Sequence, residues 1–314
     1  MENKTHIGLS VLIKEKARKL GFDLCGIARS KKLERNADAL RKWCEAGMND
    51  TMGYLARNTE KRADPSLLFN GAESLVIAGI SYYSGDRQLK PMVPVLSRYA
   101  FGKRYQTVIV NKLEKLLDFI KEYAPETDGR AFSDSAPLFE KPWAVEAGLG
   151  WQGKHSIVIN REVGSFFFLG ALVLNIGLEY DEPQIKEYCG NCTLCIESCP
   201  TGAINSNRTI DARKCIANLT IEGRDPIPVE LVPKMGRRVY GCDRCQEVCP
   251  WNKHPKAGAP EFRISRELEE MTLDDWQSMT QEDFERIFSD SPIERVGYER
   301  LKVNITMVTG HHKA

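Results

Sequence analysis

Hydrophobic residues along the first 180 positions alternate between helical and strand spacing. Apolar side chains recur every three or four residues in four segments, which predicts helices over 8–20, 33–46, 105–123 and 138–147. Short runs that are almost wholly apolar lie between them and predict buried strands over 22–28, 74–82, 156–160 and 166–175. This alternation predicts an α/β or α+β domain rather than a helical bundle.

The composition changes after residue 180. A polar segment that includes Pro183 is typical of a linker. The residues that follow hold most of the cysteines and few periodic segments, and beyond Pro260 the chain becomes acidic with helical spacing. We therefore predict three parts, namely a first domain over 1–180, a cysteine-rich domain over 181–260 and a helical C-terminal extension over 261–314.

The charge of the chain is almost balanced in total but not along its length. The 314 residues include 44 Lys+Arg and 43 Asp+Glu, a formal net charge of +1, which argues against a protein held on nucleic acid mainly by its overall field. Residues 261–314 contain 7 Lys+Arg against 12 Asp+Glu, a net charge of −5, which leaves +6 for residues 1–260. A basic body therefore still permits an RNA partner.

No segment of the sequence is typical of a secretion signal or a membrane span. Charged residues rather than an apolar run follow Met1, and the most apolar stretch, over 165–177, is too short to cross a bilayer. We therefore expect a cytoplasmic protein without membrane contact. In such a reducing compartment, clustered cysteines more often bind metal than form disulfides.

Eight of the ten cysteines form two related runs. The first, Cys189-x2-Cys192-x2-Cys195-x3-Cys199-Pro200, has the spacing of bacterial ferredoxins, in which the fourth cysteine reaches the other of two [4Fe-4S] clusters. The second reads Cys242-x2-Cys245-x3-Cys249-Pro250, with Cys215 alone upstream in place of its missing first cysteine. This crossing rule assigns the first cluster to Cys189, Cys192, Cys195 and Cys249, and the second to Cys199, Cys215, Cys242 and Cys245.

Two structural zinc sites would also use eight thiolates. Zinc does not require this spacing, and the pattern therefore favours two [4Fe-4S] clusters that transfer electrons. Cys25 and Cys44 lie outside both runs, and we expect them to be buried or idle thiols.

Two motifs in the first domain point to binding or catalysis without settling it. Gly148-x-Gly150-x-x-Gly153 matches a dinucleotide fingerprint, but a predicted helix precedes it and a strand follows, so we reject a nucleotide site there. Asp134 is predicted to open a helix, either as its N-cap or, if Ser135 caps the helix instead, as a free proton donor.

Other polar residues of the first domain also have two interpretations. His155 fits a binding site or a buried wall equally well. Arg57, Arg62 and Asp64 could form a surface ion-pair cluster. The basic and aromatic residues over 97–99 and 103–104 suit an RNA backbone and a stacked base, although a solvated face is the commoner explanation.

Taken together, these motifs resemble the epoxyqueuosine reductase family. The two-cluster module of that family is similar to residues 189–253, including CGNCTLCIESCPTGAI, DARKCIANLTIE and MGRRVYGCDRCQEVCPWN. The first domain is similar at FSDSAPLFE (132–140), at AGLGWQGKH (147–155), and over 57–65, 97–99 and 164–170. The resemblance spans residues 8–305, and the DSAP and AGLGWxGK motifs distinguish this family from ferredoxins at large.

The resemblance implies an α+β fold in which a nitroreductase-like α/β cobalamin-binding domain precedes a bacterial ferredoxin-like double [4Fe-4S] domain and a short helical tail. It implies an oxidoreductase that removes the epoxide oxygen of epoxyqueuosine at the tRNA wobble position to give queuosine. Co(I) cobalamin fed by the two clusters would supply the electrons, which an external low-potential donor would provide. Longer members carry C-terminal helical repeats, whereas this chain resembles the short form, and we expect a monomer.

The resemblance also implies roles for individual residues. Asp134 would be the proton donor that faces the cobalt. The corrin would be lined by Arg57, Ser97, Lys154, His155 and Ser156. The chain lacks the D-x-H-x-x-G pattern that supplies a histidine to cobalt in other cobalamin modules, so cobalamin would be bound base-off.

Three positions depart from the family pattern. Members usually read G-x-D-Y-H where this chain has Arg104, Tyr105 and Gln106 after Gly102-Lys103, and they usually carry Glu where Ala171 lies. These departures keep open a cobalamin and iron–sulfur reductase of a small molecule, similar to reductive dehalogenases. A second alternative is a non-enzymatic electron carrier with two clusters, which would have no corrin site.

Overall fold

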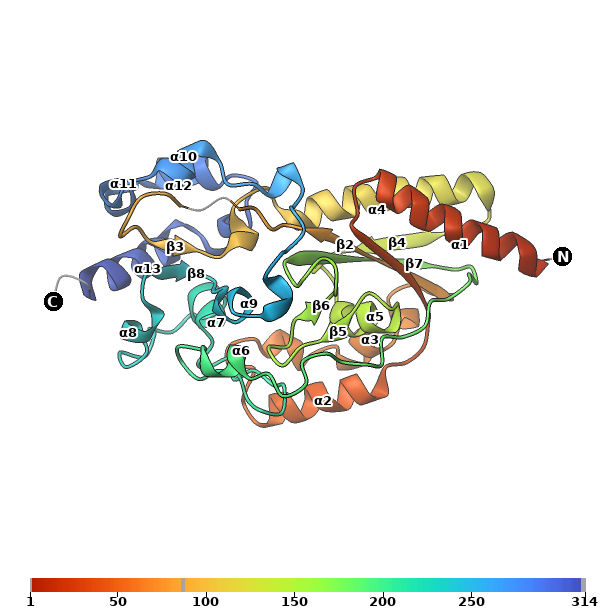
Figure 1. Cartoon of the computed structure of the whole chain (residues 1–314), viewed down its shortest axis with the longest axis horizontal. Coiled ribbons are helices and arrows are strands. Elements are labelled where there is room, and N and C mark those ends of the chain that lie inside the picture. The colour runs from red at the N-terminus through yellow and green to blue at the C-terminus, as the bar shows by residue number, and fades with distance from the viewer. Residues whose placement is uncertain (1, 86–87, 312–314) are drawn as a thin grey trace.

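The computed structural model describes residues 2–85 and 88–311, and the side chains of residues 8–85 and 88–310. The molecule is elongated, and its first and last helices lie at opposite ends (Figure 1). One half contains a sheet with helices on both faces, and the other half contains the cysteine loops and the C-terminal helices. Within the described residues, no helix has both the length and the hydrophobicity that crossing a membrane requires.

A four-stranded antiparallel sheet forms the centre of the first half. Its strand order is β1 (Leu24–Arg29), β2 (Ser74–Ser81), β7 (Phe167–Leu174) and β4 (Gly129–Phe132). Every residue of β2 is buried. Successive side chains of a strand point to opposite faces, and accordingly Val76 and Leu75 enter two different core layers. The unbroken apolar pattern of this strand therefore reflects cover on both faces of the sheet.

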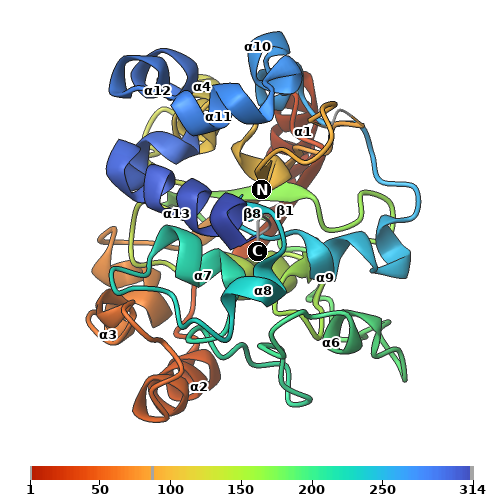
Figure 2. The same cartoon turned by 90° about the vertical axis from the view of Figure 1, so that its left-hand side faces the viewer.

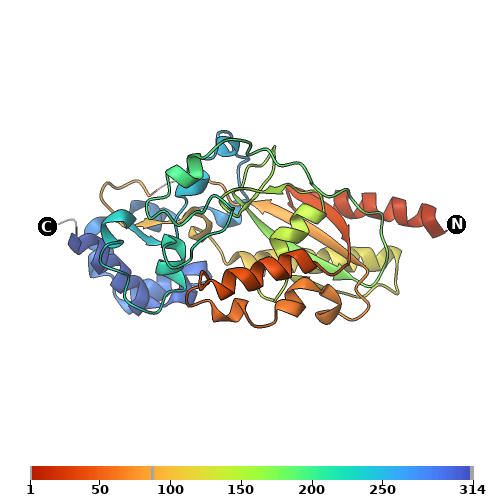
Figure 3. The ribbon, with the colours of Figure 1, turned by 90° about the horizontal axis from the view of Figure 1, so that it is seen from below.

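Helices cover the two faces of the sheet unequally. α1 (Glu2–Lys19) and α4 (Tyr105–Tyr123) lie on one face, while α5 (Glu140–Glu146) packs on the other, with α3 (Thr59–Ala63) and α2 (Glu34–Glu45) beyond it (Figures 1 and 3). α4 crosses β7 closely, since a Cβ atom at Gly170 would lie 2.3 Å from Cγ2 of Ile109. On the opposite face, the fully buried ring of Trp143 anchors α5.

The second half has its own core, and one segment from the sequence of the first half crosses over and packs in it. Residues 93–105, here called the crossing segment, leave the sheet and place β3 (Val95–Leu96) in a parallel pair with β8 (Arg238–Tyr240). Leu96 and Phe101 of this segment share a core with residues from both the cysteine-rich part and the C-terminal helices. The helix α13 (Tyr298–His311) runs over the same core (Figure 2).

The remaining elements are short. In the first half they are β5 (Trp151–Gln152) and β6 (Val158–Ile159). In the second half they are α6 (Leu194–Glu197), α7 (Ile216–Ile221), α8 (Val232–Met235), α9 (Arg244–Glu247), α10 (Arg266–Glu270), α11 (Leu273–Ser278) and α12 (Gln281–Phe288).

The α+β class predicted from the sequence is confirmed. The helix predicted over 105–123 coincides with α4, whereas α1 begins earlier than predicted and the strand predicted over 156–160 shrinks to β6. The bounds of the three parts, at residues 180 and 260, remain predictions. Neither the excursion of the crossing segment nor its pairing with β8 was foreseen.

The prediction that Asp134 opens a helix is wrong. β4 ends at Phe132, Asp134 has a φ of +51°, and α5 begins only at Glu140 with no side-chain cap from Phe139. Pro137 explains the delay, because a proline disfavours helical backbone at the residue before it. The N-cap interpretation of Asp134, and the transfer of that role to Ser135, therefore do not apply.

The glycines of the rejected dinucleotide motif have a packing role instead. α5 precedes them and β5 follows, the inverse of the order that a phosphate-binding turn needs. A Cβ atom at Gly150 would lie 2.1 Å from the carbonyl oxygen of Ile159 in β6. Gly150 thus allows two backbone segments to approach each other closely.

We predict that Gly150→Ala lowers the free energy of unfolding by about 1–3 kcal/mol, because the added methyl group must push β6 away. Urea denaturation followed by circular dichroism measures the change. Gly8→Ala is the matched control, since a Cβ atom at this position in α1 meets nothing within 4 Å and alanine favours a helix. Equal unfolding midpoints for wild type and Gly150→Ala would contradict the close approach.

Candidate active site and cysteine clusters

The first predicted quartet of cysteines comes together in the folded chain. α6 follows Cys192, α9 follows Cys242, and these two short helices pack against each other. Burial raises the pKa of Cys249, and the nearby thiols of Cys189, Cys195 and Cys192 raise it further. Two segments that are far apart in sequence therefore bring one set of four thiols into one neighbourhood.

The second quartet forms a neighbouring group. Burial raises the pKa of Cys215, with Cys199 as the thiol that adds to the shift. Burial likewise raises the pKa of Cys242 to about 11 and that of Cys245 well above its ordinary value, and Cys215 contributes to both. Cys195 of the first quartet also acts on Cys245, so the two groups adjoin, and the division of the eight ligands between them stays a prediction.

The donor chemistry of these groups fits iron–sulfur clusters. Thiols with raised pKa values stay protonated at neutral pH unless a metal displaces the proton, so binding iron would supply the missing charge compensation. Among the described residues, no three Cys, His, Asp or Glu side chains converge closely enough to hold a single metal ion. The ligands of a cluster stand further apart, because its iron atoms occupy separate corners.

Aromatic and basic side chains pack against the loop from Cys189 to Cys195, here called the first cysteine loop. Nε1 of Trp151 donates a hydrogen bond to Sγ of Cys189 at 3.5 Å, and the Trp151 ring packs edge-on against both Tyr188 and Trp251. Nζ of Lys154 donates to the carbonyl oxygens of Gly190 at 2.7 Å and Cys192 at 3.0 Å. The structure therefore places Lys154 against the cysteine loop.

The crossing segment supports the second cysteine loop. The buried hydroxyl of Ser97 donates to Asp243, which lies between Cys242 and Cys245, and the Arg98 backbone N–H donates to the other carboxylate oxygen of Asp243 at 2.8 Å. Ser97, Cys242 and Asp243 line a cavity of about 390 Å³. None of the other residues that the resemblance assigns to the corrin lines this cavity.

Asp134 lies on an exposed turn between β4 and α5, and two hydrogen bonds hold it there. The Tyr105 hydroxyl donates to Oδ2 of Asp134 at 2.5 Å, and the Asp134 backbone N–H donates to Oε1 of Glu140 at 2.6 Å. The ring of Tyr105 stacks on Phe168 of β7 with centroids 4.1 Å apart. A rigid sheet residue therefore sets the position of the Tyr105 hydroxyl.

The charges around Asp134 act strongly on one another. Loss of solvent and the Asp134 carboxylate raise the pKa of Glu140 to about 8, while burial and Asp134 raise the pKa of Tyr105. Desolvation lowers the pKa of Lys141, while Asp134, Glu140 and the thiols of Cys245 and Cys215 act in the opposite direction. Lys141 thus lies within electrostatic reach of both the Asp134 turn and the second cysteine group.

The other predicted site residues have mixed surroundings. His155 is buried, its Nδ1 accepts from the Ile157 backbone N–H, and its buried Nε2 has no hydrogen-bond partner among the described residues. Burial and Lys141 lower its pKa to about 4, so its ring is neutral at pH 7. The Ser156 hydroxyl donates to the carbonyl oxygen of Arg208 at 2.6 Å, and Arg57 is exposed.

The three departures from the family pattern have structural counterparts. Arg104 forms an ion pair with Glu294 of the C-terminal part. The side-chain oxygen of Gln106 is buried without a described partner. Ala171 is fully buried and pairs with Phe132 of β4, where the surroundings are apolar.

Sequence reasoning missed three residues that contact or act on Asp134, namely Tyr105, Glu140 and Lys141. Tyr105 was visible because this chain keeps it, together with Gly102, in the G-x-D-Y-H pattern from which Arg104 and Gln106 depart. Glu140 ends the FSDSAPLFE motif, but a glutamate at a helix start is ordinarily read as a favourable charge at the helix dipole. Nothing in the pattern marks Lys141.

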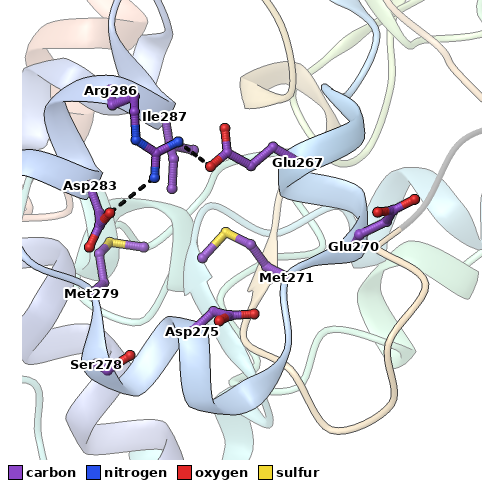
Figure 4. A pocket seen from close by; sticks show the side chains of 9 residues that line it. All are labelled: Glu267, Glu270, Met271, Asp275, Ser278, Met279, Asp283, Arg286 and Ile287. Atoms are coloured by element: carbon purple, nitrogen blue, oxygen red, sulfur yellow. Dashed lines mark hydrogen bonds and ion pairs between the residues drawn. The ribbon is translucent and has the colours of Figure 1, made fainter.

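A further cavity, of about 330 Å³, lies among α10, α11 and α12 (Figure 4). Its wall is mainly acidic, and its only cation among the described residues, Arg286, pairs with both Glu267 and Asp283. It shares no residue with the cysteine groups or the Asp134 turn.

Two family models match the chain. Residues 188–252 match a 4Fe-4S double cluster binding domain, and residues 62–135 match the epoxyqueuosine reductase QueG family. The epoxyqueuosine reductase of Cyclobacterium marinum is 42% identical over 95% of this chain and 96% of its own. That of Escherichia coli is 38% identical over 96% of this chain and 81% of its own.

Solved structures of similar proteins share the fold. An epoxyqueuosine reductase from Bacillus subtilis, with its catalytic aspartate loop swung out of the active site, is 28% identical with a TM-score of 0.90, covering 98% of this chain and 82% of that one. An epoxyqueuosine reductase with an epoxyqueuosine-modified tRNA-Tyr stem loop has the same identity, TM-score and coverage. The double-cluster match confirms the predicted pair of [4Fe-4S] clusters, while the ligands of each cluster remain predictions.

We predict that Cys215→Ala loses the second cluster and retains the first, because Cys215 replaces the missing first cysteine of the second run. After anaerobic reconstitution, iron and sulfide content should fall by about half. Cys44→Ala, outside both runs, is the control and should keep the full content. A Cys215→Ala protein with the iron content of wild type would overturn the ligand assignment.

Proposed function

The chain belongs to the epoxyqueuosine reductase family, and we propose that the Asp134 turn is where it reduces epoxyqueuosine in tRNA to queuosine. One observation carries this proposal: the exposed Asp134 carboxyl and the thiols of Cys215 and Cys245 all act electrostatically on Lys141. The proposed proton donor and the proposed electron source therefore lie within electrostatic reach of one side chain. The catalytic aspartate loop of the Bacillus subtilis relative supports the assignment of Asp134.

The reaction consumes two electrons and two protons for each epoxide. Both carbon–oxygen bonds of the three-membered ring break, a carbon–carbon double bond forms, and the oxygen leaves as water. We assign the first proton to the Asp134 carboxyl, which then takes up another from solvent because it is exposed. The Tyr105 hydroxyl, 2.5 Å from Oδ2, holds this carboxyl in one orientation.

Electrons would enter through the first cluster and leave from the second. Four residues of the first cysteine loop, Gly190, Asn191, Thr193 and Leu194, are exposed, so an external low-potential donor can approach that cluster. The second quartet includes the two thiols that act on Lys141, so we assign the exit of electrons to it. Cys245 of the second quartet has Cys195 of the first among its neighbours, which brings the two clusters close to one another.

We also propose cobalamin as the cofactor between the second cluster and the substrate. Two predicted corrin contacts have groups free to meet a ligand, namely the buried Nε2 of His155 and the exposed Arg57. Ser97, Lys154 and Ser156 donate to protein groups and would instead shape the wall. When bound, cobalamin would supply a strongly nucleophilic reduced cobalt, and the proposal remains that it is base-off.

The partner and its compartment follow from the substrate. The relatives named above are epoxyqueuosine reductases, and one of them is seen with an epoxyqueuosine-modified tRNA stem loop. The net charge of +6 on residues 1–260 is compatible with a tRNA phosphate backbone. We propose that this chain acts on tRNA in the cytoplasm as a monomer.

We predict that Asp134→Asn reduces turnover by about 10²- to 10⁴-fold, because the amide cannot donate the proton. Turnover is measured as the formation of queuosine in epoxyqueuosine-containing tRNA, which is digested to nucleosides and analysed by mass spectrometry. The absorbance of the clusters should not change. Asp128→Asn, at the turn before β4, is the matched control and should remain active. Normal turnover by Asp134→Asn would remove Asp134 from the mechanism.

The same assay separates the alternatives. Activity on free small epoxides or halides but not on tRNA would favour a small-molecule reductase. Absence of turnover on either substrate, with clusters that still accept electrons, would favour an electron carrier. Queuosine formation by wild type from tRNA is the result that the proposal requires.

A further inference from the structure

The backbone of Asp134 lies in a sparsely populated conformation, which aspartate adopts more readily than most residues but still at a cost. Its φ of +51° lies in the left-handed region, which costs free energy for any residue other than glycine. The turn begins from a fixed point, because the hydroxyl of the buried Ser133 donates to the carbonyl oxygen of Leu169 in β7 at 2.8 Å. Beyond Ser133, something other than the sheet must hold Asp134.

Glu140 is the residue that meets this need. Its Oε1 accepts the Asp134 backbone N–H at 2.6 Å, across the turn from the start of α5. α5 has no side-chain cap at Phe139, yet the Glu140 carboxyl reaches back to the turn rather than serving the helix. This contact acts on the backbone of Asp134, whereas the Tyr105 contact acts on its carboxylate.

We propose that Glu140 is a positioning residue that latches the Asp134 turn in the conformation in which its carboxylate meets Tyr105. This inference rests on the proposed function of Asp134 and adds the element that places it. Without the Glu140 acceptor, the left-handed residue loses its backbone partner and the turn can relax outward. The Tyr105 hydroxyl alone then holds a mobile carboxylate.

The charges that face Glu140 favour a latch that works without its own negative charge. Asp134 and loss of solvent raise the pKa of Glu140 to about 8, while Lys141 and Arg62 act in the opposite direction. A protonated carboxyl still accepts a hydrogen bond through its carbonyl oxygen and does not repel Asp134. Glutamine should therefore replace Glu140, and alanine should not.

Hydrogen exchange tests the latch directly and needs no catalysis. We expect amides of residues 133–139 to exchange roughly tenfold faster in Glu140→Ala, the effect of losing one such hydrogen bond, and at the wild-type rate in Glu140→Gln. Glu146→Ala is the matched control, because Glu146 lies at the other end of α5 and pairs with Lys31. Wild-type exchange in Glu140→Ala, or equally fast exchange in Glu140→Gln, would overturn the proposal.

Kinetics and pH provide the second measurement. Glu140→Ala should lower kcat with KM for tRNA unchanged, and Glu140→Gln should restore kcat. The pKa of Glu140 is raised in the folded state, so the native state binds more protons than the unfolded state between about pH 4.5 and 8. The stability of wild type therefore falls as the pH rises through that window. Glu140→Gln should lack this fall in melting temperature, and an identical fall in both proteins would contradict the placement of Glu140.

The two proposals can fail separately. If wild type forms no queuosine but Glu140→Ala still loosens residues 133–139, the latch stands and the assigned reaction fails. If wild type forms queuosine and exchange is the same in every variant, the reaction stands and the latch fails.

Discussion

The crossing segment is the constraint on which the geometry of this protein depends. Within thirteen residues, 93–105, the chain leaves the sheet, pairs with β8, and returns to begin α4. On the way, Ser97 binds Asp243 between two cysteines of the second group. At its end, Tyr105 binds the Asp134 carboxylate. One short stretch of chain therefore contacts both the second cysteine group and the Asp134 carboxylate, the proposed electron source and proton donor.

The C-terminal part braces this segment from outside. The Lys103 backbone N–H donates to the carbonyl oxygen of Glu261 at 2.9 Å, and a Cβ atom at Gly102 would lie 2.3 Å from the same oxygen. Arg104 adds its ion pair with Glu294. Arg104, which departs from the family pattern, thus contacts the acidic C-terminal part. An acid at position 104 would face Glu294 with like charge, which gives this chain a physical reason for its basic residue.

The sequence reveals some parts of this arrangement and hides others for identifiable reasons. The cysteine runs predicted the two clusters correctly, because thiols that bind one cluster must lie a few residues apart in the chain and this spacing is visible in the sequence. β2, β7 and α4 were predictable because their apolar patterns record local burial. The crossing segment was not, since Leu96 and Phe101 show no periodicity that distinguishes one core from another. The helix predicted over 138–147 is close to α5, but its cap was misplaced because Pro137 disfavours helical backbone at the residue before it.

Contacts between side chains distant in sequence were the least predictable. Tyr105 meets Asp134 only because β7 carries Phe168 beneath the tyrosine ring. Ser97 was predicted to line the corrin, and in the structure its hydroxyl donates to the carboxylate of Asp243, 146 residues away. Lys154 similarly supports the loop of Cys192. In each case the resemblance to a family drew attention to the residue, while its partner in the fold had to be found in three dimensions.

The central claim is that electrons held by the two clusters are used at the Asp134 turn. A single-turnover experiment tests it most directly: reconstituted protein is reduced anaerobically, freed of reductant, and mixed with epoxyqueuosine-containing tRNA. Cluster absorbance and queuosine are then followed in the same samples. The account predicts that two electrons leave the clusters for each queuosine formed, at matching rates. Queuosine that forms while the clusters stay reduced, or clusters that reoxidise without forming queuosine, would contradict it.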